Sequence, residues 1–144
     1  MKSSCIISIP NDPFLIVKES YSKLFQGNWK TSMLLSFFEE EHNFKVEQSK
    51  QAKMWNDEAE KNDEKRTQDE SLYLHFTLQE LQDVMMGVLS RRAINNGLSE
   101  LEEYCFISCH KNPKQDRSFD HTPFYLFHPE IVSAVLQKWN YNYE

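Results

Sequence analysis

The chain has 144 residues, a length that favours a single domain, and 40% of them are hydrophobic, which is enough to build a core. Its three glycines and five prolines argue against an all-β fold rich in turns. The formal net charge of −6 repels phosphate, so any nucleic-acid interface has to come from a local cluster of basic side chains. No stretch approaches the run of about 20 apolar residues that a membrane-spanning helix needs.

Residues 1–13 are predicted to form an extended N-terminal arm. The apolar run at residues 5–9 ends at Pro10 and is too short for the hydrophobic region of a secretory signal peptide. The three cysteines are an odd number without disulfide-framework spacing, which is typical of reduced thiols. We therefore expect a cytoplasmic protein.

Two helices are predicted next. A short one spans residues 19–25 and is closed by Gly27, and a strong one begins after Asn28, whose side chain suits a helix N-cap. The apolar residues of the second helix recur at the spacing of one helical stripe, so this helix is expected to form the centre of the core. The stripe consists of Trp29, Met33, Leu34, Phe37 and Phe38, and the acidic residues Glu39, Glu40 and Glu41 follow it.

Residues 45–71 differ in composition, because they are mostly charged or polar. Such a segment cannot bury enough apolar surface to fold alone. Either it extends the preceding helix into solvent, or it is a mobile loop. Trp55 lies within it, and we expect this side chain to pack back on the domain because large apolar groups rarely stay exposed. A contact between Trp55 and a partner is the alternative.

The second half of the chain has the signals of a helix-turn-helix. A strand-like run at residues 72–76 precedes a helix that starts with the capping-box pair Thr77 and Glu80. Gly87 can end this helix, and Ser90 can cap the next one. A short turn that contains glycine is the connection that a helix-turn-helix needs.

The second of these helices is predicted over residues 91–103. Strand-like runs at 105–110 and 124–127 then indicate a hairpin, and Pro129 stands at the natural first position of a last helix. We predict a mainly α fold with a small β-hairpin, a winged helix-turn-helix, over residues 14–139, with 45–71 as an insert or helix extension. The helical stripe expected to face the core is Ile94, Leu98, Leu101 and Cys105.

The outward face of the helix at 91–103 is the candidate DNA-binding site. Arginine and asparagine form paired hydrogen bonds with guanine and adenine edges, and a recognition helix enters the major groove. Basic residues in the tip of the hairpin are expected to hold the DNA backbone or minor groove, and Lys30 to add a phosphate contact. The predicted contact residues are Ser90, Arg91, Arg92, Asn95, Asn96 and Ser99 on the helix, and Lys111, Lys114 and Arg117 in the hairpin.

The sequence signals for a metal site or a catalytic site are weaker. Cys105, Cys109 and His110 lack a second pair of ligands with zinc-site spacing, and the cysteines are better read as core residues. The sequence contains no phosphate-binding glycine loop, no H-E-x-x-H pattern and no nucleophile turn. We expect neither an enzyme nor a bound metal or cofactor.

The stretches 89–102, 106–108 and 120–125, with a preceding helix like that at 29–42, resemble the winged-helix replication proteins of phages and plasmids, such as replisome organisers and replication initiators. The resemblance covers about residues 14–137, apart from 45–71. It implies binding to origin or promoter DNA, contact with helicase-loading proteins, and a DNA-contacting role for Ser90, Arg91, Arg92, Asn95, Asn96 and the wing.

A second function class stays open. The acidic balance suggests a protein-interaction module or an inhibitor that binds a nucleic-acid-processing protein. Its candidate contacts are Glu39, Glu40, Glu41 and Trp55. A homodimer with contacts at Trp139 and Tyr141 is compatible with either class, since helix-turn-helix proteins often read paired half-sites.

Overall fold

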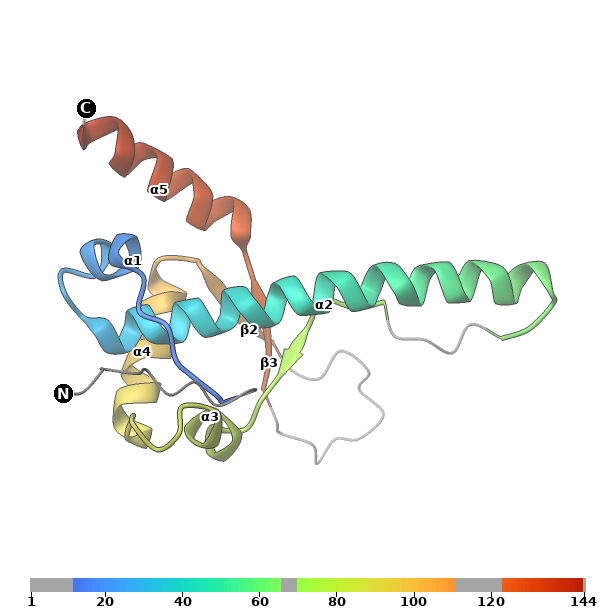
Figure 1. The fold of residues 1–144 in the computed structure, drawn as a ribbon, viewed down its shortest axis with the longest axis horizontal. Coiled ribbons are helices and arrows are strands. Elements are labelled where there is room, and N and C mark those ends of the chain that lie inside the picture. Colours follow the sequence, from blue (N-terminus) through green and yellow to red (C-terminus); the bar gives the residue numbers. More distant parts are fainter. Residues whose placement is uncertain (1–11, 66–69, 111–122, 144) are drawn as a thin grey trace, which may run out of the picture.

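The computed structural model describes residues 12–65, 70–110 and 123–143. The described part is mainly helical and contains a small three-stranded antiparallel sheet (Figure 1). The elements in chain order are α1 (Glu19–Leu24), α2 (Trp29–Lys61), β1 (Leu74–His75), α3 (Leu78–Val84), α4 (Arg91–Glu103), β2 (Ile107–His110), β3 (Phe124–Phe127) and α5 (Pro129–Tyr143).

Helix α2 is the axis of the molecule, and its first half forms the centre of the body. Asn28 caps it, because the side-chain oxygen of Asn28 accepts a hydrogen bond from the backbone N–H of Thr31. Leu34 and Phe38 are fully buried, as the stripe predicted. Trp29 is an exception and is 42% exposed, because it occupies the first helical position, at the edge of the body.

The second half of α2 shows that residues 45–61 extend the preceding helix. The helix continues through Lys61 and projects from the body as an arm (Figure 1). The chain returns along the arm, where the Asn56 side-chain amide donates a hydrogen bond to the Glu70 carboxylate at 2.8 Å and Ser49 Oγ donates to the Glu70 carbonyl. Asn56 is buried although the sequence around it is polar.

Trp55 does not pack on the domain, so that expectation was wrong. Its side chain is 61% exposed on the arm, beside the turn that ends α2. The physical reason is distance, because α2 carries this position away from the body (Figure 1).

The sheet has the strand order β1-β3-β2. Strand β3 is central, and Tyr125 pairs with Leu74 on one side and with Cys109 on the other. Burial raises the pKa of the Tyr125 hydroxyl to about 12. The sheet is tied to α2 by an edge-to-face contact between the rings of Tyr125 and Phe38, 5.4 Å apart.

Local signals set the starts of α3 and α4 as predicted. Thr77 and Glu80 form both hydrogen bonds of the capping box, and Ser90 Oγ accepts a hydrogen bond from the Ala93 N–H. Between the helices the chain turns through Met86 and Gly87, both with positive φ. The turn is tight because glycine adopts this backbone conformation without steric cost.

Two apolar assignments in this half were wrong. Cys105 does not belong to the buried stripe of α4, because the helix ends at Glu103 and Cys105 is exposed with φ of +62°. Cys109 is also exposed, although it lies on the same face of β2 as the buried Ile107. Both thiols are free.

The core joins α1, α2, α3, α4, the sheet and the start of α5. Val132 of α5 is buried, and Pro129 opens that helix with Glu130 in its first turn, as predicted. None of the described helices combines the length and apolarity needed to cross a membrane. The largest fully buried apolar side chains are Phe38, Phe106, Leu34, Leu35, Leu81, Met85, Leu89, Ile94, Leu101 and Ile107.

Candidate functional site

Helix α4 presents a polar face that the body leaves uncovered. Its opposite side is fixed in the core by Ile94 and Leu101, which are fully buried against α2 and α3. A helix held on one side in this way exposes its other side rigidly. The exposed residues of this polar face are Ser90, Arg91, Arg92, Asn95, Asn96 and Ser99.

The charges along α4 are arranged against the helix dipole. No acidic residue lies in its first turn, where Arg91 and Arg92 stand, and the exposed Glu102 and Glu103 lie in its last turn. Cations at the N-terminus and anions at the C-terminus each cost a helix a few tenths of a kcal/mol or more. The arrangement is therefore poor for helix stability but good for binding an anion at the N-terminus, where backbone N–H groups also point outward.

Two residues of the polar face have structural partners. Arg91 donates hydrogen bonds to the side-chain oxygens of Gln79 at 2.7 Å and Gln82 at 3.3 Å, which connects the start of α4 to α3. Ser90 is engaged as the helix cap. Arg92 is the exposed cation of this face that shows no hydrogen bond or ion pair to another described residue.

A close approach of two helices holds α4 in place. A Cβ atom on Gly97 would come within 2.4 Å of Leu34 Cδ1, so the missing side chain lets α4 lie directly against α2. The sequence placed Gly97 within the candidate helix but did not reveal this role. A glycine in a helix interior, which costs stability unless packing requires it, was the signal.

The predicted hairpin contacts Lys111, Lys114 and Arg117 lie outside the described residues. Lys30, the additional basic residue expected near this site, is exposed at the start of α2, with its ammonium group 5.6 Å from the centre of the Trp29 ring.

The three consecutive glutamates have three different environments. Glu39 accepts a hydrogen bond from the Tyr21 hydroxyl at 2.9 Å and forms an ion pair with Lys18, so it belongs to the fold. Glu40 is exposed, and Glu41 is half-buried. Burial and, secondarily, the charge of Glu40 raise the pKa of the Glu41 carboxyl.

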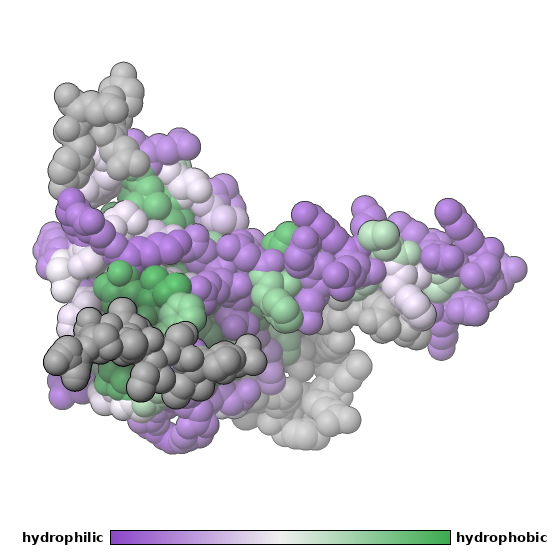
Figure 2. All heavy atoms as spheres, viewed as in Figure 1, coloured by the Kyte–Doolittle hydropathy of each residue, from purple (hydrophilic) through white to green (hydrophobic). Residues whose placement is uncertain are grey.

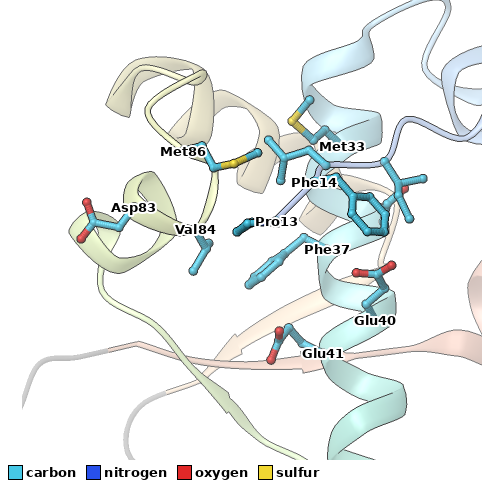
Figure 3. A pocket seen from close by; sticks show the side chains of 12 residues that line it. Pro13, Phe14, Met33, Phe37, Glu40, Glu41, Asp83, Val84 and Met86 are labelled. Carbon is cyan, nitrogen blue, oxygen red and sulfur yellow. The ribbon is translucent and has the colours of Figure 1, made fainter. Parts of the chain in front are cut away.

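Glu40 and Glu41 stand at one end of a groove that the sequence did not predict. The groove has a volume of about 420 Å³ and runs between the N-terminal segment, α2 and α3. In Figure 3, Pro13, Val84 and Phe37 lie around its centre. Its lining consists of Pro13, Phe14, Leu15, Ile16, Met33, Ser36, Phe37, Glu40, Glu41, Asp83, Val84 and Met86.

The groove surface is largely apolar, and one buried hydroxyl without a partner among the described residues lies beneath it. Phe14 is 76% exposed, and Val84 and Met86 are also exposed. Figure 2 shows apolar residues gathered on the body, while hydrophilic residues cover most of the arm. Ser36 is 2% exposed, and its Oγ has no hydrogen-bond partner among the described residues. A buried polar group without a partner costs about 1–3 kcal/mol.

A polar cluster of Ser108, His110, His128 and Glu130 lies between β2 and the start of α5. Ser108 Oγ lies 2.9 Å from His128 Nε2 and 2.7 Å from His110 Nε2, and His128 Nδ1 lies 3.6 Å from a Glu130 oxygen. The last distance is too long for the hydrogen bond that orients a catalytic histidine. Among the described residues no group of histidine, cysteine or carboxylate side chains is arranged to hold a metal ion.

Comparison with known proteins gives no further assignment. The chain matches no protein-family model, no curated protein and no solved structure.

Proposed function

We propose that this protein is a winged-helix protein that binds duplex DNA through α4, with a role in the replication or transcription of a mobile element. The observation that carries the proposal is the polar face of α4, which combines arginine, asparagine and serine side chains on a helix fixed by its apolar side. These are the side chains that read base edges in the major groove.

The order of the elements supports the same proposal. From α2 onward the chain runs helix, strand, helix, helix, strand, strand, and the sheet order β1-β3-β2 places the first strand beside the last. A winged helix has this order, with the second helix of the turn motif as the recognition helix. The role in a mobile element rests on the resemblance to phage and plasmid replication proteins.

The test is a binding titration with matched variants. We expect the wild-type chain to bind a pool of random duplexes of about 20 base pairs at low salt, with an affinity that falls steeply as salt rises. Arg92→Ala combined with Asn96→Ala should weaken binding at least tenfold, since contacts of this kind contribute about 1–3 kcal/mol each. Fluorescence anisotropy of labelled duplex measures the change.

The control is Lys53→Ala combined with Gln51→Ala, which removes the same kinds of group from exposed positions on the arm. The control should bind as the wild type does, and both double variants should unfold at the same urea concentration as the parent. Equal weakening by the two double variants, or no duplex binding by the wild type, would exclude α4 as a DNA interface.

A further inference from the structure

We propose that the groove between the N-terminal segment, α2 and α3 is a docking site for a short peptide segment of a partner protein. The segment carries a large apolar side chain flanked by arginine or lysine. This function goes beyond DNA binding and uses none of the residues of the polar face of α4.

The apolar part of the proposal rests on side chains that line a concave surface. Phe14, Val84 and Met86 are exposed large hydrophobic residues from two separate segments, and they meet in this groove. Its volume of about 420 Å³ falls within the range of small-ligand sites, about 300–1,000 Å³, and is enough for one or two large side chains. Clustered exposed apolar groups of this kind mark interaction surfaces.

The two carboxylates at one end of the groove indicate a partner with positive charge. Glu40 and Glu41 stand together at the lower end in Figure 3, and no described cation pairs with either of them. Their neighbour Glu39 differs, because Lys18 and Tyr21 satisfy it within the fold. Burial and the charge of Glu40 raise the pKa of Glu41, so nothing in the described part of the fold offsets the negative charge of this carboxylate. A cation from a partner would offset it.

Ser36 lines the groove and is buried, and its hydroxyl lacks a partner among the described residues. Its Oγ is closed off from the groove surface, so contact with a peptide rests on the apolar side chains and the carboxylates. Carboxylates at the end of the groove repel phosphate, which disfavours nucleic acid and anionic lipid as occupants.

The experiment is a selection of random twelve-residue displayed peptides on the full-length wild-type protein, followed by titration of synthetic copies of the enriched sequences. We expect the enriched peptides to carry a large apolar residue next to arginine or lysine, and their affinity to fall as salt rises. Glu40→Lys should weaken their binding at least tenfold, and Phe14→Ser should do the same. Both positions are exposed, so the fold is preserved.

The matched control is Glu47→Lys, which makes the same charge change at an exposed position of α2 away from the groove and should leave peptide binding unchanged. Failure to enrich any peptide, enrichment of neutral or acidic peptides, or equal effects of Glu40→Lys and Glu47→Lys would overturn the proposal. Displacement of the selected peptides by a synthetic peptide of residues 1–11 would assign the groove to this chain instead. A dimer that dissociates in Phe14→Ser would assign it to a second copy.

Discussion

Adjacent residues of identical type have different roles in this protein, and Glu39, Glu40 and Glu41 show why. Successive positions on a helix point about 100° apart, so three consecutive side chains meet three environments. Glu39 turns toward Lys18 and Tyr21, Glu40 toward solvent, and Glu41 is partly covered. The acidic run is therefore one structural ion pair followed by two carboxylates at a groove.

The raised pKa of Glu41 predicts a pH-dependent effect of Glu41→Gln. The folded state disfavours the charged carboxyl, so ionisation of Glu41 lowers the free energy of unfolding as pH rises above the ordinary pKa of 4.5. Glu41→Gln should therefore raise the free energy of unfolding at about pH 7, and the gain should disappear as pH falls through and below the ordinary pKa. Urea denaturation at a series of pH values measures it.

Glu47→Gln is the matched control, because it removes the same charge from an exposed position of α2. Its effect at neutral pH should be much smaller than that of Glu41→Gln. If Glu41→Gln lowers the free energy of unfolding at neutral pH, the carboxylate has a favourable partner and the uncompensated charge at the groove is ruled out.

The position of α4 is decided by one contact between helices. Leu34 of α2 is fully buried beneath Gly97, where α4 has no side chain. Burying a leucine side chain stabilises a protein by about 1.5–3 kcal/mol, so this contact is a substantial part of what holds the polar face outward. The candidate DNA interface thus depends on a packing detail on the far side of the helix.

Gly97→Ala tests this contact. Alanine in a helix interior gains about 1 kcal/mol over glycine, whereas overpacking a filled core costs about 1–3 kcal/mol. Because the new Cβ would lie 2.4 Å from a Leu34 atom, we expect the cost to exceed the gain and the free energy of unfolding to fall by about 1 kcal/mol. Urea denaturation gives the value.

A double-mutant cycle isolates the cause of that loss. In a Leu34→Val background, where the neighbouring side chain is shorter, Gly97→Ala should be neutral or stabilising. Ser99→Ala, an exposed change on the same helix, should alter the free energy of unfolding by only a few tenths of a kcal/mol. Stabilisation by Gly97→Ala in both backgrounds would show that the two helices do not approach this closely.

At the scale of the whole molecule, α2 connects the body and the arm, which are stabilised by different kinds of contact. Its first half lies in the core of the body, while its second half contacts the returning chain through small and polar groups such as Asn56 and Glu70 (Figure 1). Local opening costs least where few apolar contacts must break. One continuous helix should therefore have two levels of stability.

Amide hydrogen exchange can resolve these levels. We expect the N–H groups of residues 32–38 to exchange only through global unfolding, and those of residues 47–60 to exchange faster, through opening of the arm. NMR exchange measured under native conditions provides both rates. Equal protection along α2 would mean that the arm and the body unfold as one unit.

Features that depend on neighbours in the chain were predictable. Asn28, Thr77 and Ser90 cap their helices, Gly87 follows the end of α3, and Pro129 opens α5, because each acts on backbone groups within a few residues. The exposed polar face of α4 followed from helical periodicity for the same reason. The winged arrangement and its DNA-binding role stay predictions.

The features that the sequence did not predict have two causes, the meeting of distant segments and a local turn after α4. Trp55 was expected to pack and is exposed, because its environment is set by where α2 carries it. Cys105 left the apolar stripe because α4 ends at Glu103 and the chain turns at Cys105, where φ is +62°. The groove escaped detection because its walls come from segments far apart in sequence, such as Phe14 and Val84.

The sequence by itself determined the helix starts, the mainly helical class and the amphipathic character of α2 and α4, since these follow from hydrogen bonding and periodicity along one segment. Tertiary structure decided that α2 continues into an arm, that Gly97 admits Leu34, and that Glu40 and Glu41 border an apolar groove. These features arise only where separate elements meet, because burial and charge compensation depend on the neighbours that folding brings together.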